Sequence, residues 1–266
     1  MLKYQASFLM GLERSLEYRF EFFINIISTF FPIIIQVFLW FAIYSGTGQG
    51  QMYGYSLPQM LAYVAIAGAV GKFVVTGIEY MVNEDIHSGG LAVFLVKPVK
   101  YVRFRIFQVM GEKFTSSITM LIFTAAVIAV LRISVGFEIN FWNILSFIIA
   151  LLLAAFLNFY IFFLVSISAF WLTEVGRFFH ALQVIIMVIS GGVFPISVFG
   201  EGYVAVSRYF PFQYTTYFPI GVLTGAVNTT GIYTGIFLQI VWIIILWLVS
   251  NVLWRVGLKR YVAVGG

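Results

Sequence analysis

The chain has 266 residues, of which 62% are hydrophobic and 9% are charged, and its formal net charge is +5. A soluble domain carries about 25% charged residues, and one globular core of this size cannot hide so much apolar surface from water. The composition therefore excludes an ordinary soluble enzyme and predicts a protein embedded in lipid. The basic residues do not form a stripe, so nucleic-acid binding is not expected. With no cysteine, disulfides and thiolate metal sites are excluded.

The N-terminal segment, residues 4–21, is expected to lie along the inner membrane surface and not to cross it. Leu9, Leu12 and Leu16 recur at spacings of three and four, whereas Glu13 and Glu17 follow a separate line. A helix with one apolar and one charged face is typical of the membrane–water interface. The alternative is a solvated helix with no special role.

Six later stretches are apolar and long enough to cross a bilayer, which takes about 20 residues of helix. They cover about 22–44, 58–82, 114–131, 142–170, 176–194 and 231–254. Gly191, Gly192 and Pro195 interrupt the fifth stretch near its end. The predicted fold class is all-α: residues 1–266 form a single polytopic domain with about six transmembrane helices.

The distribution of basic residues predicts the orientation. With the N-terminus inside, twelve basic residues fall on the cytoplasmic side: Lys3, Arg14, Arg19, Lys97, Lys100, Arg103, Arg105, Lys113, Arg177, Arg255, Lys259 and Arg260. Two, Arg132 and Arg208, fall outside, and Lys72 lies within a span. Because basic residues concentrate in cytoplasmic loops, both termini are expected in the cytoplasm.

The largest polar segment is the cytoplasmic loop 83–113. Leu91, Phe94 and Leu95 form an apolar triplet on one helical face, and a helix there should end at Lys97-Pro98. A second amphipathic stretch follows. The loop is therefore expected to form two short helices at the membrane surface.

Two charges fall inside the second apolar stretch, where each costs about 2.5–3.5 kcal/mol at the helix centre. Lys72 comes about fourteen residues into the stretch, and Glu79 follows seven residues later on nearly the same helical face. One hypothesis is that Lys72 lines a hydrated cavity and meets an anionic group. The alternative is that it snorkels, or pairs with a carboxylate on a neighbouring helix.

The segment 195–230 is too apolar for an open loop and too long for a turn. Irregular backbone at membrane depth survives only where protein covers it, so short helices dipping into the outer leaflet are expected. Its candidate outer-gate residues are Pro195, Phe199, Tyr209, Phe210 and Phe212. The alternative is a static aromatic lid anchored at the lipid headgroups.

Catalytic and cofactor motifs are absent from the sequence. No phosphate-binding Gly-x-x-x-x-Gly-Lys-Ser/Thr, metal-binding His-Glu-x-x-His or nucleophilic Gly-x-Ser-x-Gly pattern occurs. The two histidines, His87 and His180, offer little for a metal. The chain itself is predicted not to be an enzyme and to hold no cofactor or metal.

Several short motifs nevertheless resemble those of one family. They are Asp85-Ile86-His87-Ser88-Gly89-Gly90-Leu91, Leu95-Val96-Lys97-Pro98, Gly191-Gly192-Val193-Phe194-Pro195, Tyr209-Phe210-Pro211-Phe212 and Leu258-Lys259-Arg260-Tyr261. With the surface helix and six spans, this layout resembles the type-2 (ABC-2) ABC transporter permeases, and more narrowly an uncharacterised bacterial subgroup.

The resemblance implies one half of an exporter in a bacterial cell membrane. Two permease chains, identical or homologous, would form the pathway, and separate cytoplasmic ATPase subunits would bind ATP and Mg. In such families the first cytoplasmic loop carries the coupling helix on which the ATPase docks. Here that maps onto Glu84, Asp85, Ile86, His87, Ser88, Gly89, Leu91, Phe94 and Leu95.

Two other functions stay open at this point. A secondary transporter or channel would use intramembrane charges such as Lys72 and Glu79. A membrane scaffold would not transport at all. The sequence does not indicate the substrate.

Overall fold

The computed structural model describes residues 2–17, 19–135, 140–172 and 175–261. These residues form helices joined by short loops, apart from one small hairpin, and so confirm the all-α prediction. The long helices are α1 (Leu2–Glu17), α2 (Arg19–Thr47), α3 (Leu57–Val74), α4 (Ile78–His87), α6 (Tyr101–Val135), α7 (Phe141–Ser166), α8 (Gly176–Ile189) and α11 (Thr229–Leu258). The short helices are α5 (Gly90–Val96), η1 (Ile167–Phe170), η2 (Ile196–Phe199), α9 (Glu201–Ser207), η3 (Phe212–Thr215) and α10 (Tyr217–Leu223).

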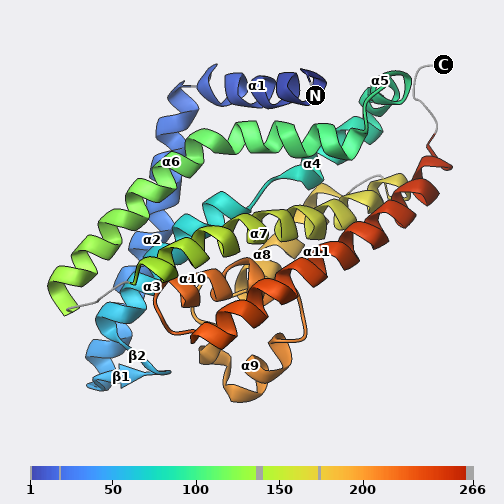
Figure 1. Ribbon diagram of the computed structural model, residues 1–266. Coiled ribbons are helices and arrows are strands. Elements are labelled where there is room, and N and C mark those ends of the chain that lie inside the picture. Colours follow the sequence, from blue (N-terminus) through green and yellow to red (C-terminus); the bar gives the residue numbers. More distant parts are fainter. Residues whose placement is uncertain (1, 18, 136–139, 173–174, 262–266) are drawn as a thin grey trace.

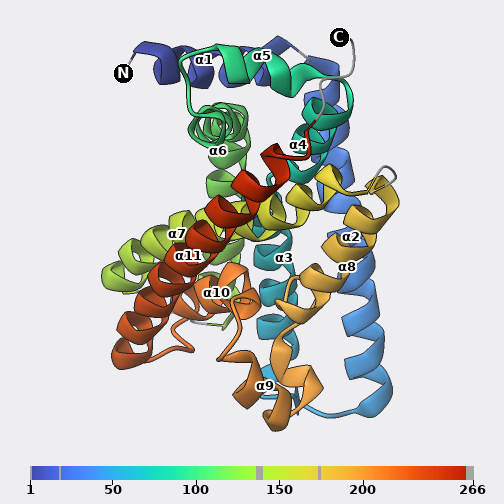
Figure 2. The ribbon, with the colours of Figure 1, turned by 90° about the vertical axis from the view of Figure 1, so that its right-hand side faces the viewer.

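The bundle has two distinct ends (Figures 1 and 2). α1, α5 and the C-terminal part of α11 lie at one end, which we call the α5 end. The hairpin and α9 lie at the opposite end, which we call the α9 end. The hairpin pairs β1 (Gln51–Met52) with β2 (Tyr55–Ser56) across a two-residue turn. The arrangement places the N-terminal helix and the end of the last helix on one side of the molecule.

Three helical segments in the described part of the chain are apolar and long enough to cross a membrane. They are Leu57–His87, Phe141–Phe170 and Thr229–Leu258. The other expected spans correspond to shorter apolar helical segments, Phe31–Thr47, Met120–Val130 and Gly176–Ile189. The structure therefore supports a membrane-spanning helical core, whereas the number six stays a prediction.

The second expected span is not one continuous helix. α3 ends at Val74, and α4 begins at Ile78 after a break in which Gly77 has a φ of 68°. A φ in the left-handed region favours glycine, so the break has a local cause in the sequence. It corrects the prediction that Lys72 and Glu79 share one helical face, because they lie on different helices.

The loop 83–113 also differs from its prediction. Only α5 is a separate short helix, whereas α6 runs without interruption from Tyr101 to Val135. The expected second surface helix and the third expected span are therefore one helix. After Pro98 no residue in the sequence forbids helix up to the apolar run, and an isolated glycine such as Gly111 is tolerated inside a helix.

Helix α1 is separate from α2, as predicted, but ends at Glu17 and packs on α6. A Cβ at Gly11 would lie 2.1 Å from the carbonyl oxygen of Gln108, and a Cβ at Gly111 would lie 2.0 Å from that of Phe8. The two backbones therefore touch where the helices cross, which only glycine allows. Leu9 of α1 stays exposed.

The segment 195–230 contains short helices, as predicted. α10 is almost completely buried, between α7 and α3. α8 ends at Ile189, where Gly191 has a φ of 84° and the amide of Gly192 donates to the carbonyl of Met187. This is a Schellman ending, which depends on the glycine.

Candidate functional site

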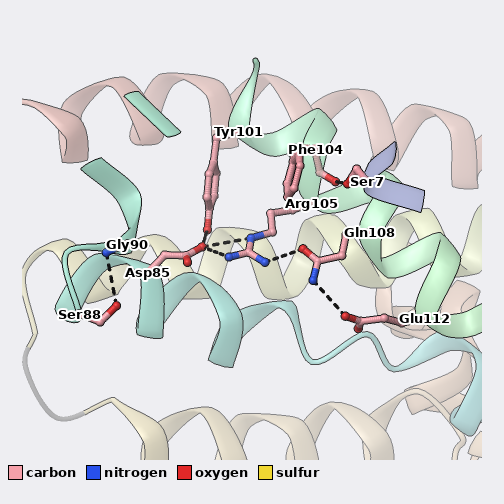
Figure 3. A network of polar contacts seen from close by, with 9 residues as sticks. All are labelled: Ser7, Asp85, Ser88, Gly90, Tyr101, Phe104, Arg105, Gln108 and Glu112. Carbon is pink, nitrogen blue, oxygen red and sulfur yellow. Dashed lines mark hydrogen bonds and ion pairs between the residues drawn. The ribbon is translucent and has the colours of Figure 1, made fainter. Parts of the chain in front are cut away.

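A network of charged and polar side chains joins α4 to α6 at the α5 end (Figure 3). Asp85 Oδ2 accepts hydrogen bonds from the Tyr101 hydroxyl and from the Arg105 guanidinium, whose Nε lies 3.1 Å away. Arg105 Nη1 donates to Gln108 Oε1 at 2.6 Å, and Gln108 Nε2 donates to Glu112 Oε1 at 3.1 Å. One carboxylate of α4 is thus bound by several donors from α6.

The sequence spacing explains how α6 presents these groups together. Tyr101, Arg105, Gln108 and Glu112 are separated by four, three and four residues, which places them along one face of a helix. Asp85 and Arg105 are both buried. A buried ion pair of this kind is costly to leave half-made, so α4 and α6 are expected to move as one unit. Burial raises the pKa of the Tyr101 hydroxyl, which keeps it protonated as a donor at neutral pH.

Aromatic contacts attach α5 to the same unit. The Phe94 ring packs edge-on against Tyr101 at 5.1 Å and against Phe104 at 5.0 Å, and it lies 5.3 Å from the Arg105 guanidinium. Tyr101 also stacks on Trp254 of α11, with centroids 5.0 Å apart. Phe94 therefore links α5 to both α6 and, through Tyr101, the last helix.

The structure corrects one part of the predicted docking face. Leu91 is completely buried, at 0% exposed, and therefore does not face a partner. Leu95 is exposed, as expected, and Val93 and Val96 are exposed beside it, Val96 at 84%. The outward apolar surface of α5 thus consists of these three residues.

The other predicted coupling residues divide between the surface and the interior. Glu84, His87 and Ser88 are exposed, whereas Asp85 and Ile86 are buried. Gly89 has a φ of 80°, which provides the sharp turn between α4 and α5. The exposed residues thus surround the turn, and the buried ones hold it to the bundle.

Lys113 stabilises the interruption of the second span. Its Nζ donates to the carbonyl oxygen of Lys72 at 2.9 Å, near the C-terminal end of α3. The last carbonyls of a helix lack internal partners and attract positive charge. Lys113 therefore caps α3 from α6, a role different from its predicted place in the cytoplasmic loop.

Glu79 lies in the first turn of α4 and is buried, at 1% exposed. Neither carboxylate oxygen has a hydrogen-bond partner among the described residues. Lys72 lies on α3, on the other side of the helix break, and lines a cavity that does not include Glu79. The structure thus places the two predicted intramembrane charges in different surroundings.

The predicted outer-gate residues lie in the segments around α9. Pro195 is buried before η2, whereas Phe199 is exposed and contacts Tyr203 with ring centroids 4.8 Å apart. Tyr209 and Phe210 are exposed, and Phe212 packs against the core. The structure does not bring these residues into one cluster.

A cavity of about 360 Å³ lies between α2, α3, α7, α8 and η3. Lys72, Gln36 and Asn158 contribute polar groups to its wall, and Ile33 and Phe162 contribute apolar ones. This size falls within the usual range for small-molecule sites, about 300–1,000 Å³.

A comparison with protein families identifies the chain from its sequence. The family model for ABC-2 family transporter proteins matches residues 30–265. The chain belongs to this family. No curated protein matches it. Membership of this family is consistent with a membrane subunit of an ABC-2 transporter. The absence of a phosphate-binding motif from the sequence agrees with this.

Sequence reasoning missed several residues of this ABC-2 protein that the structure brings together. Tyr101, Arg105 and Gln108 fall in the stretch for which the sequence predicts a second short surface helix, and their helical spacing was a signal for a polar face. Asn158 lies in a very apolar stretch of the sequence. A single amide side chain in such a stretch indicates either a contact with a neighbouring helix or a cavity.

Proposed function

We propose that this ABC-2 protein is the permease subunit of an ATP-driven exporter in a bacterial cell membrane. In this proposal two permease chains, identical or homologous, form the pathway. Separate cytoplasmic ATPase subunits bind ATP and Mg and dock at the α5 end. Both termini face the cytoplasm, and the α9 end faces outward.

The observation that carries the proposal is the surface of α5. Val93, Leu95 and Val96 are exposed at the end of the bundle, next to a turn bordered by polar residues. A short helix with exposed apolar residues suits a groove on a partner protein. The distribution of basic residues favours the same end as cytoplasmic.

The network behind α5 provides the mechanical link that coupling needs. Force applied to α5 reaches α6 through Phe94, and it reaches α4 through the Asp85–Arg105 pair. The same force reaches α11 through the stacking contact of Tyr101 with Trp254. Movement of a docked ATPase would therefore shift several long helices together.

Co-purification with the cognate ATPase tests this proposal. Val96→Asp places a charge on the exposed face of α5 and is expected to abolish most ATPase binding while the permease stays folded. Val206→Asp is the matched control, because Val206 is also exposed but lies on α9 at the opposite end. Equal recovery of ATPase with both variants would contradict docking at α5. Transport in the wild type without any ATPase would favour a secondary transporter instead.

The outer gate is part of the same proposal. The Ser197 hydroxyl donates to the carbonyl of Tyr53 at 3.3 Å, which connects η2 to the hairpin. A disulfide formed in the double variant Ser197→Cys, Tyr53→Cys is expected to block transport until it is reduced, if the short helices must move for release. Unchanged transport in the oxidised protein would show a static lid.

A further inference from the structure

A second cavity, of about 320 Å³, lies between α6 and α7, and we call it the α6–α7 groove. α6 runs between α1 and α7 (Figures 1 and 2), and α1 contributes Phe8 to the wall of the groove. The wall also includes Ile106, Met110 and Phe114 of α6 and Leu151, Leu152 and Phe156 of α7. The groove is therefore lined mainly by apolar side chains from three helices.

The polar groups of the wall offer little to an occupant. The Lys113 ammonium donates to the carbonyl oxygen of Lys72, and the Ser117 hydroxyl donates to the carbonyl oxygen of Lys113. The hydroxyl oxygen of Thr76 is buried and has no surface in the groove. Water in the groove would find almost no hydrogen-bond partners, and an empty space of this size forfeits packing contacts. The wall therefore favours an apolar occupant.

The α6–α7 groove is open along the flanks of both helices. Five of its lining residues are exposed, from 40% for Ile148 to 50% for Leu152, and the other three are Met110, Phe114 and Leu121. α7 belongs to a segment that is apolar and long enough to cross a membrane, so the opening lies at membrane depth. Whatever fills the groove must therefore enter from within the bilayer.

A positive charge lies at the end of the groove nearest the start of α6. Arg103 is exposed and precedes Ile106 and Met110 by three and seven residues, so it lies on the same face of α6, one turn beyond the groove. Tyr160 follows Phe156 by one turn on α7, and its hydroxyl interacts electrostatically with Arg103. None of the described residues that line the groove is acidic. A guanidinium at the end of an apolar groove complements the phosphate of a lipid whose chain fills that groove.

We propose that the α6–α7 groove binds one acyl chain of an anionic phospholipid and that Arg103 binds the phosphate of its headgroup. A helix of a second protein chain is about 10–12 Å across with its side chains, which is too wide for a space of about 320 Å³. An acyl chain is narrow, bends easily and needs no hydrogen bonds, so it fits both the shape and the chemistry of the wall. The proposal requires only that the chain lies in a membrane, and it does not depend on an ATPase or on transport.

Photo-crosslinking of the purified full chain tests the site. The chain is placed in phosphatidylcholine nanodiscs that contain a small fixed fraction of phosphatidylglycerol with a diazirine on its acyl chain, and adducts are mapped by mass spectrometry. Adducts on Met110, Phe114 and Leu152 are expected to exceed several-fold those on Phe237 and Ile244, which are exposed on α11 outside the groove. The same diazirine on phosphatidylcholine should give a ratio of groove to α11 adducts about fivefold lower, since a basic residue attracts net negative charge.

Matched substitutions assign the effect to the residues. Arg103→Gln should lower the ratio for phosphatidylglycerol to that for phosphatidylcholine, whereas Arg103→Lys, which keeps the charge, should retain most of the preference. Arg255→Gln is the control, because Arg255 is an exposed basic residue at the same end of the molecule, on α11. Ala155→Phe narrows the groove and should reduce groove adducts with both lipids, while Ala129→Phe, exposed on α6 outside the groove, should not.

Three outcomes would overturn the proposal. They are equal labelling of the groove and of α11, equal ratios for the two lipids in the wild type, and an unchanged preference in Arg103→Gln. Absence of groove adducts together with disulfide-linked dimers of the Phe114→Cys variant would show that a second copy of the chain covers the groove instead. If Ala155→Phe does not fold, the wild type and the variants at the exposed Arg103 still decide. No arm of the experiment contains an ATPase, so this proposal and the docking proposal fail separately.

Discussion

The two ends of the molecule both hold interrupted helices, but they satisfy the interrupted backbone with different chemistry. Toward the α5 end, Asp85 and Arg105 form a buried ion pair across α4 and α6, and Lys113 binds the end of α3. Toward the α9 end, the last carbonyls of α8 are bound by neutral donors. The Tyr203 hydroxyl donates to Ile189 at 2.8 Å, and the Tyr63 hydroxyl donates to Gly191 at 2.7 Å.

This difference has an energetic consequence. Removing one partner of a buried ion pair leaves an uncompensated charge and costs about 3–5 kcal/mol, whereas a neutral hydrogen bond contributes about 1 kcal/mol. The α5 end should therefore be rigid and sensitive to single substitutions. The α9 end should tolerate the loss of any one bond, as suits segments proposed to move.

The largest effect is expected from Asp85→Ala. It leaves the buried Arg105 guanidinium without its carboxylate and should lower the free energy of unfolding by about 3–5 kcal/mol. The measurement is the thermal unfolding midpoint of the purified protein. Glu84→Ala is the matched control, since Glu84 is the exposed neighbour on the same helix. Equal midpoints for the two variants would refute a structural role for the ion pair.

A smaller effect is expected where α1 crosses α6. Gly111→Ala adds a Cβ that would lie 2.0 Å from the carbonyl oxygen of Phe8, so α1 must shift. The cost should be about 1–3 kcal/mol, as for other overpacked contacts. Gly202→Ala meets no atom within 4 Å and should instead stabilise α9 slightly. The same sign of change in both variants, by thermal unfolding, would contradict the close crossing.

At the α9 end, Tyr63→Phe should have a still smaller effect. It removes only the hydroxyl that donates to Gly191, and is expected to cost about 1 kcal/mol. Tyr233→Phe is the control, because that side chain is 72% exposed. A loss as large as that of Asp85→Ala would show that the two ends are equally rigid.

The last prediction concerns which side of the membrane each end of the molecule faces, and its substitutions involve no loss of stability. Thr47, near the hairpin, and Lys97, after α5, are both exposed, so either position accepts a cysteine. A membrane-impermeant maleimide added to intact cells should label the Thr47→Cys variant. It should label the Lys97→Cys variant only after the cells are permeabilised. Labelling of Thr47→Cys from the inside alone would reverse the proposed orientation of both ends.

Local features of the sequence predicted the long helices well. The apolar run 142–170 corresponds to α7 with η1, and 231–254 lies within α11. The end of α8 followed from Gly191 and its neighbours, because a left-handed residue terminates a helix locally. These predictions succeeded because the length of an apolar run and the position of a glycine determine where a helix lies and ends through residues that are close in the sequence.

Predictions that required knowing which helices contact one another were less complete. Leu91 was expected on the surface but is buried, since an apolar residue on a short helix can face either a partner or its own core. The Asp85–Arg105 pair joins residues separated by twenty positions on two helices, and the spacing within α6 alone does not name the partner.

The sequence by itself determined that this protein is a bundle of apolar helices in a membrane, because composition and run length leave no other solvent for them. It also determined the family, through residues 30–265. Only the tertiary structure decided that the second span is broken at Gly77, that Lys113 caps it, and that Lys72, Asn158 and Gln36 share one cavity. Those features depend on contacts between distant helices, and the geometry of such contacts exists only in the folded chain.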